Sequence, residues 1–142
     1  MTSANIGSAL RVMEVGDTFT VTFSEPLNPR VVLAANAKQT DPSGPGNDLL
    51  TIVGLTNGAL DLGADTFVTP DGGSIVYPDS TMTMLNANTA VRSAIVGECS
   101  GSACGSNGPG ATASLSFEPE PFIKDLNGNP AEGTLTQVVT LY

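Results

Sequence analysis

Glycine and proline interrupt this chain along its whole length and limit it to short structural elements. The 142 residues include 16 Gly and 10 Pro, many of them in clusters such as DPSGPGND, TPDGG and DLNGNP. Residues of these types tolerate positive φ or fix φ at about −65°, so they break helices and end strands. We therefore expect short strands joined by turns, with at most one short helical turn.

The clearest strand signal is GDTFTVTFSEPLNP, residues 16–29. Phe19, Val21 and Phe23 alternate with threonines in this stretch. Because strand side chains alternate with period 2, the phenylalanines and the valine share one face and the threonines share the other. The pattern predicts a strand with one buried face over residues 18–23.

The same stretch ends in a corner. Pro26 has no N–H for a strand ladder and pushes Glu25 into an extended conformation, while Pro29 presets φ for a turn. Asn28 suits such a corner. We expect Glu25 to serve the local geometry and a local hydrogen bond, with no acid–base role.

Alternation and turn signals together predict eight or nine extended segments. They are expected near residues 9–15, 18–23, 30–35, 49–55, 67–68, 74–77, 81–85, 111–117 and 135–142. Strands at this spacing with no helices between them predict a single all-β domain over residues 1–142, a sandwich or a barrel. The predicted core includes Phe19, Val21, Phe23, Leu115, Phe117, Val139 and Leu141.

Charge limits the partners of such a domain. Fourteen acidic residues against five basic ones give a net charge of −9, which repels nucleic-acid phosphates and anionic lipid headgroups. We therefore expect neither a nucleic-acid nor a membrane partner. The N-terminal residues lack the charged start and apolar core of a signal peptide, so the sequence as given is expected to carry no export signal.

The two cysteines, Cys99 and Cys104, bracket a short Ser/Gly-rich loop. A loop of this length can close as a disulfide ring, which is the pairing we expect. Two free thiols in a solvated loop are the alternative. Zinc is disfavoured because the sequence contains no His to complete a tetrahedral site.

The strongest cluster of side-chain oxygens is DLNGN, with Asp125, Asn127 and Asn129 at alternate positions. The spacing predicts a tight turn, since Asn-Gly favours positive φ and Asp125 can accept backbone N–H groups. Calcium bound at these three residues is the alternative interpretation, although the loop is not an EF-hand. Further carboxylates could come from Glu25, Glu118, Glu120 and Glu132 if the fold brings them near.

Catalytic signatures are weak. Glu118 and Glu120 lie two residues apart, as paired carboxylates of glycoside hydrolases could, but the prolines around them indicate an edge or the exit of a strand. We interpret them as an exposed acidic edge. With no His, the chain has no Ser-His-Asp or Cys-His arrangement, and we expect no enzymatic activity.

Three stretches in order, GDTFTVTFSEPLNP, GSIVYPDSTMTMLN and FEPEPFIKDLNGNPA, resemble the bacterial Ig-like domains of the surface-layer type. Those domains carry a similar early motif ending in F-S-E-P and a similar late D-x-x-G-N. The resemblance covers nearly the whole chain, and the loop from Cys99 to Cys104 departs from it. It implies an Ig-like antiparallel β-sandwich of about seven to nine strands with Greek-key connections, and a role in spacing, display or adhesion.

Composition and resemblance together predict a non-catalytic module on an exterior surface. The first setting is a phage virion, where the chain would decorate a capsid or a tail and contact the major capsid protein. The alternative is a repeat of a secreted bacterial surface-layer adhesin that contacts neighbouring surface domains. Either setting permits a homo-oligomer within an assembly, and no cofactor other than calcium is anticipated.

Overall fold

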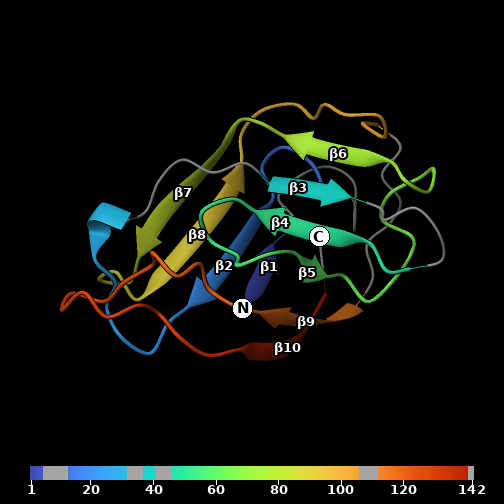
Figure 1. The fold of residues 1–142 in the computed structure, drawn as a ribbon. Coiled ribbons are helices and arrows are strands. Elements are labelled where there is room, and N and C mark those ends of the chain that lie inside the picture. The colour runs from blue at the N-terminus through green and yellow to red at the C-terminus, as the bar shows by residue number, and fades with distance from the viewer. Residues whose placement is uncertain (5–12, 32–36, 41–45, 106–111, 141–142) are drawn as a thin grey trace.

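A computed structural model of the chain describes residues 1–4, 13–31, 37–40, 46–105 and 112–140. Within these residues the protein is all-β, with ten strands and one 3-10 turn, η1 (Pro29–Val31) (Figure 1). The strands are β1 (Thr2–Ala4), β2 (Thr18–Thr22), β3 (Ala37–Thr40), β4 (Leu49–Ile52), β5 (Leu60–Asp61), β6 (Ser74–Tyr77), β7 (Ser80–Leu85), β8 (Ala90–Ile95), β9 (Thr112–Phe117) and β10 (Leu135–Thr140).

The strands form antiparallel sheets. One four-stranded sheet has the order β1-β2-β8-β7, and the other has the order β5-β4-β3-β6. In the first sheet Thr2 lies opposite Thr20, and Val21 lies opposite Val91. Strands β9 and β10 form a separate antiparallel pair, with Phe117 opposite Leu135.

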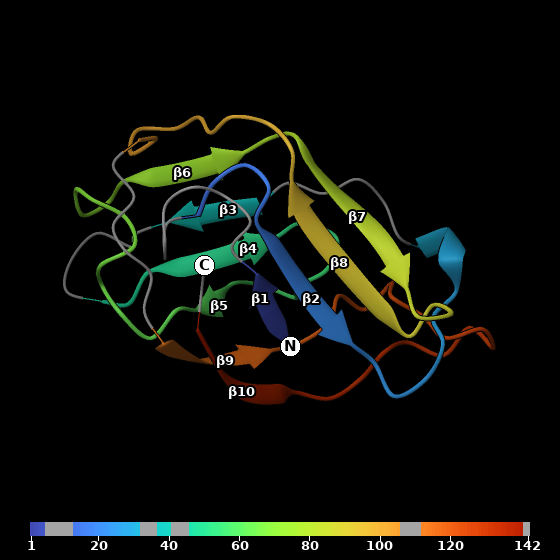
Figure 2. The same ribbon diagram turned by 180° about the vertical axis from the view of Figure 1, so that it is seen from behind.

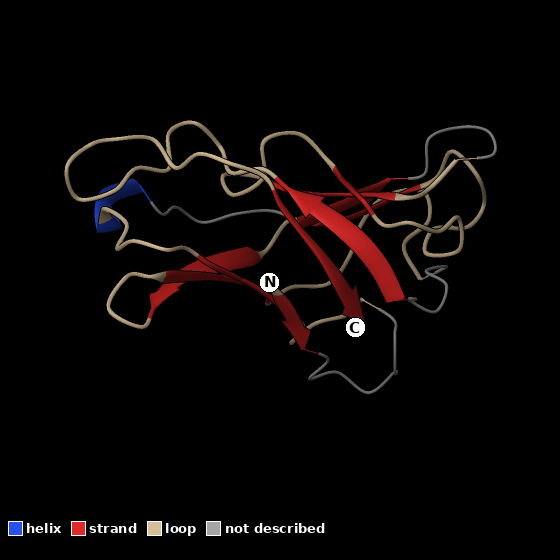
Figure 3. Ribbon diagram, turned by 90° about the horizontal axis from the view of Figure 1, so that it is seen from below, coloured by secondary structure: helices blue, strands red, loops and turns tan. Residues whose placement is uncertain are grey.

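The two four-stranded sheets lie as two layers, and their strands run in different directions (Figures 1, 2 and 3). The β9–β10 pair lies beside β5 of one sheet and near β1 of the other. It therefore links the two layers along one side. This arrangement is consistent with a β-sandwich.

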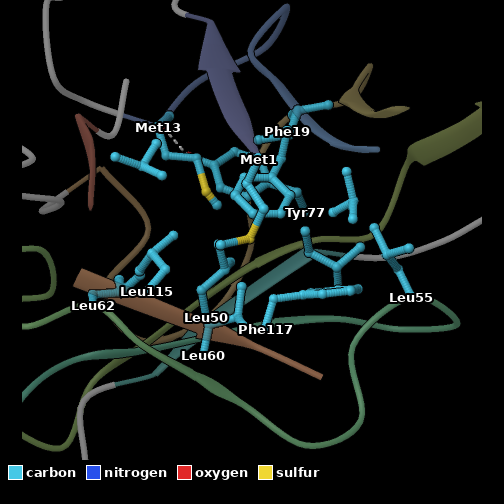
Figure 4. Close-up of a cluster of buried hydrophobic side chains, with 14 of the residues drawn as sticks. Met1, Met13, Phe19, Leu50, Leu55, Leu60, Leu62, Tyr77, Leu115 and Phe117 are labelled. Carbon is cyan, nitrogen blue, oxygen red and sulfur yellow. Dashed lines mark hydrogen bonds between the residues drawn. The ribbon is translucent and has the colours of Figure 1, made fainter. Parts of the chain in front are cut away.

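A single hydrophobic cluster lies between the sheets. Its members come from β2, β4, β5, β6, β8, β9 and β10 and from the segments between strands, and include Phe19, Leu50, Tyr77, Ile95 and Leu115. Figure 4 shows Met1 and Phe19 on one side of this cluster and Leu50 and Phe117 on the other. The side chain of Met1 is part of the cluster, and its ammonium donates a hydrogen bond to Oε1 of Gln137 at 2.5 Å.

The all-β prediction is confirmed, and so are six of the predicted extended segments. They correspond to β2, β4, β6, β7, β9 and β10. The segment predicted over residues 49–55 ends earlier than expected, because residues 53–55 form a turn in which the N–H of Leu55 donates to the Ile52 carbonyl at 3.0 Å.

Other predicted segments are wrong where the structure describes them. Residues 30 and 31 belong to η1, which follows directly from Pro29, and the rest of the predicted 30–35 segment lies outside the described residues. Residues 14–17 form a turn, so the described end of the 9–15 segment is not a strand. Phe67 and Val68 are buried but form no strand, because their N–H groups donate to a side chain, Oδ2 of Asp48.

The predicted core is largely confirmed. Phe19, Val21, Leu115, Phe117 and Val139 are buried. Phe23 is only partly buried and packs edge-on against Phe117, with ring centroids 6.3 Å apart, so its prediction as a core residue is corrected. Leu141 lies outside the described residues.

No helix in the described part of the chain is long and apolar enough to cross a membrane.

Candidate functional site

The early and late motifs of the sequence meet at one end of the molecule, at the left of Figure 1. Leu27, which follows Pro26, forms an antiparallel bridge with Asp125. The N–H of Asn28 donates to the Lys124 carbonyl at 2.8 Å. Leu27 and Ile123 are both buried, and they fix the two motifs to the core.

Asp125 closes a tight turn with its own side chain. Its Oδ1 accepts the N–H groups of Asn127 and Asn129, each at 2.8 Å. Its Oδ2 accepts the side-chain amide of Asn129, also at 2.8 Å. Gly128 has φ of +90°, and the Asp125 N–H donates to the Asn129 carbonyl at 2.9 Å. The predicted turn is confirmed in these contacts.

These hydrogen bonds also set the acidity of the carboxyl group. The bond from the Asn129 side chain is the largest influence and lowers the pKa of Asp125 below its ordinary value. Desolvation is the next influence and raises this pKa, and the backbone N–H groups of Asn129, Asn127 and Gly128 each lower it further. The donors therefore stabilise the ionised carboxylate.

The same hydrogen bonds limit the fit to calcium. Calcium takes six to eight oxygen ligands, and both carboxylate oxygens of Asp125 already accept donors from the loop. Asn129 presents its amide nitrogen, not its oxygen, to Asp125. Within the described residues, no three His, Cys, Asp or Glu side chains are grouped to hold a metal ion. Calcium at Asp125, Asn127 and Asn129 stays a prediction, and it requires the Asn129 side chain to break its bond to Asp125 and present its oxygen instead.

A groove runs between residues 21–27 and residues 129–135, and we call it the β2 groove. It consists of two adjoining hollows of about 310 Å³ and 210 Å³, which share Phe23, Ser24 and Glu132. Glu25 and Asp125 line the larger hollow. The fold thus brings three of the predicted carboxylates, from distant parts of the sequence, to one groove.

The pair Glu118 and Glu120 lies beside this groove but does not form an exposed edge. Pro119 is bridged to Thr56, the Glu118 carbonyl accepts the Asn57 N–H at 2.8 Å, and the Glu120 N–H donates to the Leu55 carbonyl at 3.1 Å. The segment is therefore paired, which corrects our interpretation of it as an edge. Glu118 is exposed and lines a separate hollow of about 240 Å³, whereas Glu120 is half-buried.

Cys99 and Cys104 lie beside the sheet β5-β4-β3-β6. Their sulfur atoms are 1.94 Å apart, a distance that fits the predicted disulfide. Within the ring they close, Ser100 pairs with Val76 of β6 through two hydrogen bonds of 2.7 and 2.8 Å. Ala103 is fully buried, and its N–H donates to the Ser74 carbonyl at 3.0 Å. The disulfide loop therefore covers the outer edge of β6.

One contact at the motif end was not predicted from the sequence. Asn86, Ala87 and Asn88, in the turn between β7 and β8, have φ of 52°, 53° and 68°. The Asn88 carbonyl accepts the Leu27 N–H at 2.9 Å. This turn therefore also positions residues 24–27, which the late motif contacts through Asp125. The repeated asparagines were the available signal, since Asn tolerates the left-handed region.

No known protein family, curated protein sequence or solved structure matches this chain. The candidate site is therefore interpreted from its own geometry.

Proposed function

We propose that this protein is a non-catalytic structural or display module that acts on an exterior surface. The observation that carries the proposal is that residues of both motifs make structural contacts. The Asp125 carboxylate accepts three hydrogen bonds from its own loop, and the early motif ends in a bridge to that loop. Both motifs therefore contribute to the fold through these contacts, and we expect binding at the outer faces and loops around them.

The sheet order supports an Ig-like fold for this module. Constant-type Ig domains have one sheet of order A-B-E-D, with C, F and G in the other. The sheet β1-β2-β8-β7 follows the A-B-E-D order, and the β9–β10 pair would correspond to F and G. The chain departs from this pattern between β2 and β7. A constant-type domain has one strand there, strand C, whereas this chain has the four strands from β3 to β6.

The disulfide and the covered edge favour an exterior location. Disulfides persist outside the reducing cytosol, and a covered sheet edge discourages pairing with other chains. We place the module on a phage virion, in contact with the major capsid protein. A repeat of a secreted surface-layer adhesin is the second candidate, and the resemblance of the motifs favours it.

Fractionation of the source tests the location. Peptides of this chain should be found by mass spectrometry in gradient-purified particles for the virion setting, or in cell envelopes for the adhesin setting. Detection only in the soluble cytoplasmic fraction would contradict both. Hydrolysis of a glycan or peptide that disappears in a Glu25→Gln variant would overturn the non-catalytic role.

A further inference from the structure

We propose that the β2 groove binds an extended, basic segment of a partner protein, which adds as a strand to the edge of β2. The inference rests on the proposed function, since a module that displays or spaces must attach to another protein. It names the attachment surface and the chemistry of the partner.

The edge of β2 beside the groove is open beyond its pairing with β1. The β1–β2 register runs from Ala4 opposite Thr18 to Thr2 opposite Thr20. On the other side of β2, the Phe23 N–H still donates to the Thr89 carbonyl at 2.8 Å, so β2 stays extended past the end of β1. An extended strand with only one neighbour can accept another.

The direction of the backbone groups follows from this bond. Hydrogen-bonding groups of successive strand residues point to opposite edges. Because Phe23 bonds toward β8, the backbone groups of Thr22, the last residue of β2, point toward the groove. Thr22 lines the groove, and within the described part of the chain it has no ladder partner on that edge.

The opposite wall of the groove consists of residues that belong to no strand. The N–H of Ala131 donates to the Ile123 carbonyl at 2.7 Å, and β10 begins at Leu135. Between these points Glu132, Gly133 and Thr134 line the groove, and Gly133 has φ of +98°. An incoming segment would therefore pair with β2 alone and lie against this wall.

The side chains of the groove define the partner's chemistry. Among the residues that the structure describes, Glu25, Asp125 and Glu132 line it, and no Lys or Arg does. Phe23, half-buried against Phe117, supplies an apolar surface between them. A strand with Lys or Arg at alternate positions and apolar residues between them matches both features, because its side chains alternate between the carboxylates and the apolar surface.

Fluorescence polarisation with a labelled heptapeptide of alternating Lys and Val tests the groove, with a peptide of alternating Glu and Val for comparison. The Lys-Val peptide should bind the intact protein, and the Glu-Val peptide should not. Glu25→Lys with Glu132→Lys should weaken binding by about tenfold or more. Asp71→Lys with Glu98→Lys changes net charge equally at exposed positions outside the groove and should alter binding by less than about twofold.

Thr22→Pro tests strand addition separately from charge. It removes an N–H that faces the groove, while the Phe23 bond to β8 remains. Binding should be lost in a variant whose melting curve shows that it is folded. Equal losses in the two charge-reversed pairs, full binding by folded Thr22→Pro, or no binding of the Lys-Val peptide to the intact protein would each overturn the groove proposal. None of these results would alter the exterior location, which fractionation tests independently.

Discussion

At the scale of single residues, two carboxylates take the place of a neighbouring strand as hydrogen-bond acceptors. Asp48 is fully buried, and its Oδ2 accepts the N–H groups of Phe67 and Val68 at 2.6 and 3.1 Å. Asp125 does the same for its own loop. Backbone donors that lack a ladder partner must be satisfied in another way, and here acidic side chains satisfy them.

Asn129→Ala should raise the pKa of Asp125 toward its ordinary value, because it removes the largest influence that lowers it. A depressed folded pKa means that Asp125 stabilises the fold above the ordinary pKa of about 3.9, and that this stabilisation is lost as pH falls below it. Carboxyl NMR titration measures the shift. Asn127→Ala is the control, since alanine retains the backbone N–H that Asn127 donates. An unchanged pKa in Asn129→Ala would contradict the hydrogen bond.

Tyr77 is the second residue with a displaced pKa. Burial, with the charges of Asp17, Glu14 and Glu98, raises the pKa of Tyr77 to about 12. Because the folded pKa lies above the unfolded value of about 10, its stabilisation is complete below pH 10 and is lost as pH rises toward 12.

The unfolding free energy of the parent protein should fall between about pH 10 and 12 as Tyr77 ionises, and Tyr77→Phe should remove this fall. It should also cost about 1 to 3 kcal/mol at pH 7, because the Met13 carbonyl loses the buried hydroxyl that donates to it. Urea unfolding across this pH range measures both effects. Identical stability of the variant and the parent at pH 7 would mean that water replaces the hydroxyl.

At the scale of elements, local signals predicted strands best where alternation was strict, as in β2, or where turn residues flanked a short apolar run, as in β6. Strand β8 was missed because Ala90 and Val91 are buried in succession and its preceding turn contains neither Gly nor Pro. Strands β1 and β5 have three residues or fewer, too short for a period to show, and β3 contains a single apolar residue, Ala37. The turn at Asp125 was predictable, since its bonds span only four residues.

Two adjacent valines of β10 test the side-chain alternation within one strand. Val139 is 7% exposed and belongs to the core, whereas Val138 is 66% exposed. Val139→Ala should cost about 2 kcal/mol through lost burial, and Val138→Ala less than about 0.5 kcal/mol. Urea unfolding of the two variants measures the difference. Equal costs would contradict the register of β10 against β9.

The disulfide loop is an element whose contribution can be separated from the rest. Replacing Cys99 and Cys104 with Ser should lower the unfolding free energy by about 2 kcal/mol, because the open loop gains freedom in the unfolded chain. Urea unfolding measures the loss. Intact mass after alkylation, with and without reductant, checks the bond itself, and two alkylated thiols in the native protein without reductant would contradict it.

At the scale of the whole molecule, the sequence could not predict the groove. Thr22 and Glu132 lie 110 residues apart in the chain, and they line one groove only because the late motif folds back onto the early one. Local periodicity carries no information about such a contact. Part of the shared core could be predicted, since Phe19 and Leu115 each lie on a predicted apolar face. The sequence did not indicate which strands of the second sheet would pack against them.

A core supplied by both sheets makes cooperative unfolding the expected behaviour of the whole chain. Leu50 of β4 and Phe19 of β2 lie in the same cluster (Figure 4), and each is at most 3% exposed. Leu50→Ala and Phe19→Ala should each cost about 2 to 5 kcal/mol, because each leaves a cavity that both layers line.

Native-state hydrogen exchange distinguishes one unit from two. Because the β9–β10 pair links the layers and the cluster spans them, either substitution should accelerate amide exchange in β2 and in β4 to the same extent. Val138→Ala, at an exposed position, should accelerate neither. Acceleration confined to the sheet that carries the substitution would mean that the layers unfold separately, and that the prediction of one domain over residues 1–142 is wrong.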